Sequence, residues 1–126
     1  MKLVLDEHVA AAVADGLAQR GVEATPLGRW MSGAWLGRAD DALLRALAEH
    51  KLLLVTYDQR TIPPLLKDWA ETGQGHGGVI FVDERTVAPS NIGGLVRGLL
   101  AVHASLGDVD WQNRIVYLRQ ESRRAD

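Results

Sequence analysis

The sequence predicts an α/β fold with a mostly parallel central sheet. Three short apolar segments, at residues 2–5, 52–57 and 79–82, are rich in strand formers and contain no turn residue. Such continuous apolar runs are typical of strands that are buried on both faces, as they are in parallel sheets. Helical patterns separate these segments, and the alternation of strands with helices favours a single α/β unit.

The N-terminal part of the chain supplies a helix, a strand and a loop. Apolar residues recur at every fourth position between residues 9 and 20, which predicts a helix that ends at Gly21. Residues 22–25 are expected to form a short strand. The stretch 27–38 has three glycines and no periodicity, so we interpret it as a loop that packs on the body of the protein.

The remaining helices are marked by their first residues. Asp40 begins one of them, where an acidic side chain suits the positive end of the helix dipole. The two prolines after Ile62 begin another, because proline is tolerated in a first turn. Ser90 is expected to cap the longest helix. Residues 73–78 predict a flexible connector, and residues 113–118 predict a final strand.

The composition limits the classes of function. The chain has 126 residues, 47% hydrophobic and 24% charged, as expected for one domain with its own core. We assign this domain to residues 1–118 and expect the charged residues 119–126 to be a disordered tail. The absence of cysteine excludes disulfide scaffolds and thiolate metal sites. The net charge of −2 and the lack of a signal peptide or long apolar segment predict a cytoplasmic protein with no membrane partner.

Acidic residues follow the three apolar segments. They are Asp6 and Glu7, then Asp58, then Asp83 and Glu84. In a parallel sheet these strand ends meet at one edge, which is where open α/β sheets bind ligands. Clustered oxygen ligands without cysteine suit Mg²⁺ or Mn²⁺, and their mutual repulsion is expected to raise some pKa values. Such a site predicts metal-assisted hydrolysis of a phosphodiester bond.

Each acidic residue also has a purely structural interpretation. Asp6 and Asp40 are suited to capping helices, and Asp58 is suited to closing an Asx turn. Asp83, with its neighbour, fits a surface turn better than a ligand site. Among the histidines, His76 is expected to lie in a mobile loop.

Three short motifs occur in order along the chain. They are Val4–Glu7 at the N-terminus, Gly37–Asp40 before a leucine-rich helix, and Leu54–Asp58. In this order they resemble the small stand-alone PIN-like proteins. The resemblance implies a three-layer α/β/α fold and a ribonuclease that depends on Mg²⁺ or Mn²⁺. Many members look like the toxin of a toxin–antitoxin pair, so it also implies an RNA substrate and an antitoxin protein as partner.

The resemblance also assigns residues to roles. Asp6, Asp40 and Asp58 become the catalytic carboxylates and metal ligands, and Glu7 matches as a further ligand. Three more residues are expected to serve substrate binding, namely Thr56, Arg38 and Arg60. Thr56 would act through its hydroxyl, by orienting Asp58 or a bound water. The two arginines are the cations nearest in sequence to the proposed ligands.

The chain departs from the family at Arg60, where the family often has a second acid. Either Arg60 binds a substrate phosphate, or this chain has lost part of the metal site. In the second case the chain would be a catalytically inactive protein- or RNA-binding module. A receiver-like phosphoacceptor is a further alternative, although no lysine ends a later strand. Trp30 and Trp35 are expected to be exposed anchors for a protein partner, and a homodimer is compatible with the sequence.

Overall fold

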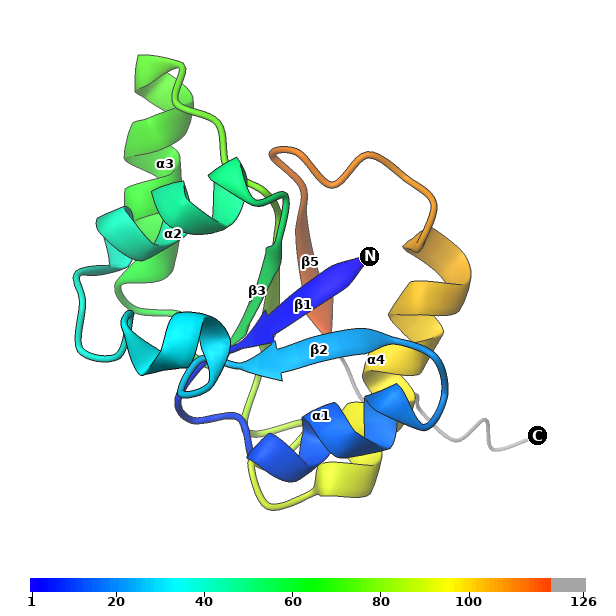
Figure 1. Cartoon of the computed structure of the whole chain (residues 1–126). Coiled ribbons are helices and arrows are strands. Elements are labelled where there is room, and N and C mark those ends of the chain that lie inside the picture. The colour runs from blue at the N-terminus through cyan, green and yellow to red at the C-terminus, as the bar shows by residue number, and fades with distance from the viewer. Residues whose placement is uncertain (119–126) are drawn as a thin grey trace.

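A five-stranded sheet forms the centre of the protein, and all of its strands are parallel. The computed structural model describes residues 1–118, so the expected tail at 119–126 lies outside the described residues. The strands are β1 (Lys2–Leu5), β2 (Glu23–Pro26), β3 (Leu53–Thr56), β4 (Val79–Val82) and β5 (Ile115–Leu118). They lie side by side in the order β2-β1-β3-β4-β5 (Figure 1). The predicted α/β class and parallel sheet are confirmed.

Four helices cover the two faces of the sheet and complete three layers. They are α1 (Ala11–Ala18), α2 (Asp40–Glu49), α3 (Ile62–Thr72) and α4 (Ile92–Leu106). Helices α1 and α4 pack together on one face, and α2 and α3 lie on the other (Figure 1). Each face has its own apolar core, because successive strand residues point to opposite sides. Leu3 and Leu5 belong to the first core, and Val4 belongs to the second. No helix within residues 1–118 is long and apolar enough to cross a membrane.

Local sequence sets the ends of the helices. Helix α3 has proline in its first turn and ends at Gly73, whose φ of 80° is a left-handed conformation that favours glycine. The N-cap of α4 is Asn91, whose side-chain oxygen accepts a hydrogen bond from the Gly94 N–H at 2.9 Å. The prediction of Ser90 as this cap is therefore wrong by one residue, because the asparagine carbonyl satisfies the free N–H instead.

Two segments predicted as loops make specific contacts with the body of the protein. Within residues 27–38, Trp30–Gly33 forms a 3₁₀ turn (η1), and the ring of Trp30 stacks on Trp35 with centroids 6.1 Å apart. Both tryptophans are half-buried against the core beneath α2, so the loop is packed as predicted and its tryptophans are not fully exposed. His76 is buried, and its Nδ1 accepts a hydrogen bond from the Gly78 N–H at 3.1 Å. The predicted loop at His76 is confirmed, but the side chain of His76 is buried in it.

Candidate active site

The C-terminal ends of β1 and β3 meet at a switch point of the sheet. The chain passes from β1 to β2 on one side and then returns to β3 on the other side of β1. In open α/β sheets, ligands bind outside the strand ends at such a point. Asp6 directly follows β1, and Asp58 lies two residues beyond β3. The topology therefore places both predicted acids beside this switch point.

Thr56 connects Asp6 with Asp58. Its side chain is fully buried, and its hydroxyl donates to Asp6 Oδ2 at 2.6 Å and accepts from the Asp58 N–H at 3.0 Å. The other carboxylate oxygen of Asp6 accepts from the Glu7 N–H at 2.8 Å. Because no part of Thr56 reaches solvent, it cannot contact a substrate directly. It positions the two acids instead.

Thr61 connects Asp58 with Asp40, the first residue of α2. Asp58 Oδ1 accepts from the N–H groups of Arg60 and Thr61, both at 2.9 Å, which is an Asx-type turn. Asp58 Oδ2 accepts from the Thr61 hydroxyl, whose oxygen also lies 3.1 Å from Asp40 Oδ2. One hydroxyl carries one hydrogen, so it can donate to only one of these carboxylates at a time. Thr61 therefore lies between the carboxylates of Asp58 and Asp40, while Thr56 links the Asp6 carboxylate to the backbone of Asp58.

The pKa values of Asp40 and Asp58 are shifted in opposite directions. Burial raises the pKa of Asp40, and the charges of neighbouring acids, Asp58 foremost, raise it further against the opposing hydrogen bond from Thr61. Burial alone would raise the pKa of Asp58 too, but hydrogen bonds from Thr61 and the backbone, with the charge of Arg60, lower it overall. Asp58 is therefore held as an anion, and its charge adds to the cost of ionising Asp40.

Within the described residues, the three acids do not form a closed metal-binding cage. No three His, Asp or Glu side chains in residues 1–118 lie close enough to hold one ion directly. Salt bridges in that part of the chain involve other residues, so no lysine or arginine in direct contact neutralises Asp6, Asp40 or Asp58. Mg²⁺ usually keeps several waters and uses only one or two carboxylates. At this edge the oxygen donors available to such an ion would be the carboxylates of Asp6, Asp40 and Asp58.

The other predicted site residues differ in how they relate to this edge. Glu7 is exposed, and its backbone N–H donates a hydrogen bond to Asp6 Oδ1. Arg60 is exposed, and its charge acts on Asp58. Arg38 is also exposed, but its guanidinium lies over the Trp35 ring, 5.8 Å from the centroid. Of the two predicted substrate-binding arginines, Arg60 is the one that interacts with the acids.

The acidic residues after β4 are in a different environment. Asp83 accepts two hydrogen bonds from the Arg85 guanidinium, at 3.0 and 3.2 Å, and one from the Arg85 N–H at 2.9 Å. Glu84 is exposed. The interpretation of this segment as a surface turn is confirmed.

Thr61 is the site residue that sequence analysis missed. A signal existed, because a threonine directly before a helix is a typical N-cap. In the structure Thr61 occupies the N-cap position of α3, yet its side chain makes no capping hydrogen bond. Its hydroxyl instead faces Asp58 and Asp40. Only the folded arrangement shows which of these two roles the side chain takes.

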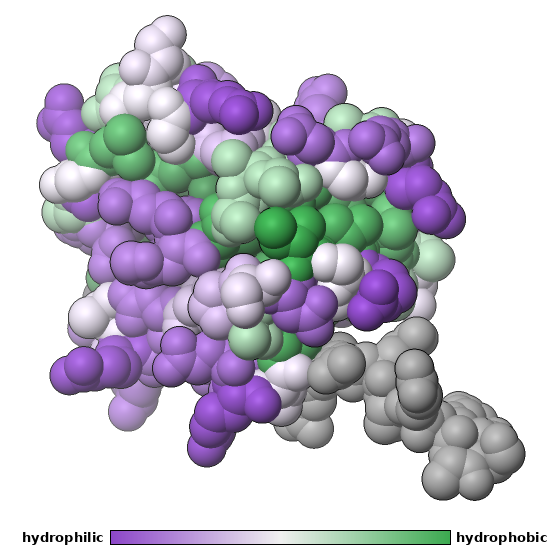
Figure 2. All heavy atoms as spheres, turned by 90° about the horizontal axis from the view of Figure 1, so that it is seen from below, coloured by the Kyte–Doolittle hydropathy of each residue, from purple (hydrophilic) through white to green (hydrophobic). Residues whose placement is uncertain are grey.

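The surface at the strand ends is mixed in character. Strands β1 and β3 run toward the lower left in Figure 1, so the view from below in Figure 2 faces the side to which they point. Hydrophilic residues cover the left part of that face, and a patch of apolar residues lies beside them (Figure 2). Comparison with family models, curated proteins and solved structures finds no match to this chain. The site itself is therefore the basis for inferring a function.

Proposed function

We propose that the C-terminal edge of β1 and β3 binds Mg²⁺ or Mn²⁺ and hydrolyses RNA phosphodiester bonds. One observation carries the proposal, namely that two threonines lie between three acids. Thr56 donates to the Asp6 carboxylate and accepts from the Asp58 backbone N–H, and the Thr61 hydroxyl lies within hydrogen-bond distance of the Asp58 and Asp40 carboxylates. This arrangement keeps three carboxylates near one another although like charges repel, and a bound cation would relieve that repulsion. A divalent ion at such a site supplies an activated water and stabilises charge on the phosphoryl oxygens.

Each residue of the site would have a separate role in the proposed hydrolysis. Thr56 fixes the direction of the Asp6 carboxylate, and Thr61 with the backbone fixes that of Asp58. Fixed carboxylates lower the reorganisation needed when a substrate binds. Arg60 is exposed beside Asp58 and supplies the positive charge for a substrate phosphate.

The resemblance to small PIN-like proteins extends the proposal to a biological role. We propose that the protein is the toxin of a toxin–antitoxin pair and that an antitoxin protein binds it. The half-buried Trp30 and Trp35 supply an aromatic surface for that partner. Co-purification with the product of a neighbouring gene tests this part. The absence of a complex would contradict it without affecting the nuclease proposal.

A cleavage assay on single-stranded RNA with Mn²⁺ tests the nuclease proposal. Asp6→Asn and Asp58→Asn should abolish cleavage, and Thr56→Val, which removes a positioning hydroxyl, should reduce it by about 10- to 100-fold. Asp83→Asn is the matched control, because Asp83 also follows a strand but is paired with Arg85. Equal loss in Asp83→Asn, or full activity in Asp6→Asn, would overturn the proposal.

A second candidate is a catalytically inactive RNA- or protein-binding module. The observation that favours it is the number of internal bonds to Asp58, whose two oxygens already accept three hydrogen bonds. A carboxylate satisfied in this way has little capacity left for a metal ion. RNA binding without cleavage at any Mn²⁺ concentration would select this candidate.

A further inference from the structure

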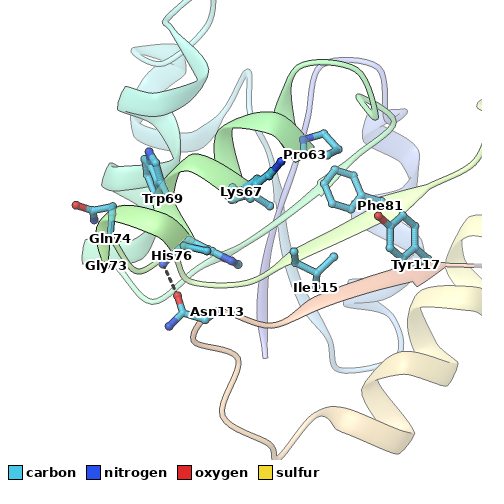
Figure 3. A pocket seen from close by; sticks show the side chains of 12 residues that line it. Pro63, Lys67, Trp69, Gly73, Gln74, His76, Phe81, Asn113, Ile115 and Tyr117 are labelled. Carbon is cyan, nitrogen blue, oxygen red and sulfur yellow. Dashed lines mark hydrogen bonds between the residues drawn. The ribbon is translucent and has the colours of Figure 1, made fainter.

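A pocket of about 490 Å³ lies between α3 and the strands β4 and β5, apart from the acidic residues (Figure 3). Its wall is mainly apolar and aromatic, and is formed in part by Leu66, Trp69, Phe81, Ile115 and Tyr117. Pockets of this size with apolar walls and a few polar groups are the usual form of ligand sites. Ile115 and Tyr117 remain 43% and 54% exposed on this edge strand, so a ligand could cover them.

The polar groups of the pocket are held in fixed orientations. His76 is 6% exposed, and its Nδ1 accepts from the Gly78 N–H, so in the neutral ring Nε2 carries the hydrogen. Burial lowers the pKa of His76, which favours this neutral form. The Asn113 side-chain oxygen accepts from the His76 N–H at 3.0 Å, which fixes the amide (Figure 3). The ring of His76 points from this bond into the pocket, toward Ile115 (Figure 3).

The charge of the pocket complements an anion. Lys67 is the one charged side chain among the described residues that line it, and no carboxylate lines it there. Lys67 is also one of only three lysines in a chain of net charge −2. Its side chain extends toward Pro63 at the start of α3 (Figure 3). Pro63 lies two residues after Thr61 in the chain, at the start of the same helix.

The aromatic rings complement a flat ligand. Tyr117 stacks on Phe81 with centroids 5.4 Å apart and an interplanar angle of 26°. Phe81 is buried, whereas Tyr117 keeps about half of its surface exposed, so a further ring can stack on it. Stacking on a tyrosine accepts any base, because every base has a π-face.

We propose that this pocket binds one nucleotide of single-stranded RNA, with the base against Tyr117 and a phosphate on Lys67. The inference rests on the proposed function for its choice of RNA. It deepens that function by assigning a substrate subsite outside the acidic edge. His76 Nε2–H and the Asn113 amide would supply hydrogen bonds to the base edge.

Binding of a fluorescent single-stranded RNA oligonucleotide in EDTA tests the proposal, because it needs neither metal nor cleavage. Tyr117→Ala should weaken binding by about 5- to 150-fold, as expected for one lost stack, and Tyr117→Phe should retain it. Lys67→Ala should also weaken binding and reduce the salt dependence of log K by about 0.7. Lys2→Ala, at an exposed lysine paired with Glu23, is the matched control and should bind as the parent does.

The outcomes separate this subsite from the hydrolysis proposed above. Binding that depends on Tyr117 and Lys67 in a protein that cleaves no RNA would support the subsite and contradict the nuclease. The absence of RNA binding by the parent would overturn the subsite, as would unchanged affinity in Tyr117→Ala and Lys67→Ala. Tighter binding of an acidic peptide of equal charge than of RNA would overturn it as well.

Discussion

The strand ends after β3 and β4 can be compared directly, because each apolar strand is followed within two residues by an aspartate. After β3, Asp58 accepts a hydrogen bond from the Thr61 hydroxyl, and its charge raises the pKa of Asp40. After β4, Asp83 is held by the guanidinium of Arg85. The same sequence pattern thus gives a cluster of acids in one place and a paired surface turn in the other. The difference shows that the local partner of a strand-end acid, Thr61 for Asp58 and Arg85 for Asp83, decides its electrostatic environment.

The largest expected difference between the two strand ends is their response to a divalent ion. A ligand that binds only the folded state stabilises it by about 2.7 kcal/mol at a hundredfold excess over its dissociation constant. Mn²⁺ should stabilise the parent and Asp83→Asn alike, and should stabilise Asp58→Asn much less. Thermal unfolding with and without Mn²⁺ measures this. An equal response of all three proteins would remove the distinction between the strand ends.

A second difference concerns the buried hydroxyl of Thr56. Thr56→Val leaves Asp6 Oδ2 and the Asp58 N–H without their partner, so we expect a loss of about 2 kcal/mol in the free energy of unfolding. Thr86→Val is the matched change at the other strand end, where the exposed hydroxyl bonds to the Asp83 carbonyl. This substitution should change the free energy of unfolding by no more than about 0.5 kcal/mol. Denaturant titration compares the two variants, and similar losses would contradict the assignment.

A third prediction follows from the lowered pKa of Asp58. A carboxyl group whose pKa is lower in the folded state stabilises the fold above its unfolded pKa, and this contribution is lost as pH falls through the folded pKa. Asp58→Asn should therefore destabilise the metal-free protein at neutral pH, by about 1 kcal/mol from the weakened hydrogen bonds. The difference from the parent should shrink in acid. A constant difference from pH 7 to acid would show that the charge of Asp58 is not involved.

The smallest effect is expected at Asp40, and its sign is opposite. Because its pKa is raised, ionised Asp40 destabilises the fold above the folded pKa, and this penalty vanishes as pH falls toward the unfolded value. Asp40→Asn should raise the melting temperature slightly at neutral pH without metal, and the gain should disappear in acid. Asp41→Asn, at the exposed neighbour, is the control. A lower melting temperature for Asp40→Asn at neutral pH would show that its charge stabilises the start of α2.

The fold could be predicted because its signals are local. Apolar runs mark the buried strands β1, β3 and β4, and each predicted element exists with ends shifted by a few residues. The ends were less predictable, since Ser90 and Asn91 are both good N-cap residues. Burial of His76 was not predicted, because the contacts of its loop, such as the hydrogen bond from the His76 backbone N–H to Asn113, come from distant parts of the sequence.

The candidate site could be predicted only in outline. A parallel sheet brings Asp6 and Asp58 to the same edge, and this followed from strand patterns. The role of Thr61 did not follow, because a hydroxyl can cap a helix or bond to a carboxylate with equal chemistry. The directions of the pKa shifts also did not follow. Repulsion predicted raised values in general, whereas hydrogen bonds from the turn lower that of Asp58.

The central claim is that a divalent ion binds at the strand ends of β1 and β3, and paramagnetic broadening of backbone amide NMR signals by Mn²⁺ tests it most directly. At low Mn²⁺ concentrations, the amide signals of Asp6, Asp58 and Thr61 should broaden first, because paramagnetic relaxation falls steeply with distance from the ion. The signals of residues 83–87 should broaden only later. Broadening centred on residues 83–87, or spread evenly over the exposed acidic residues, would contradict the account.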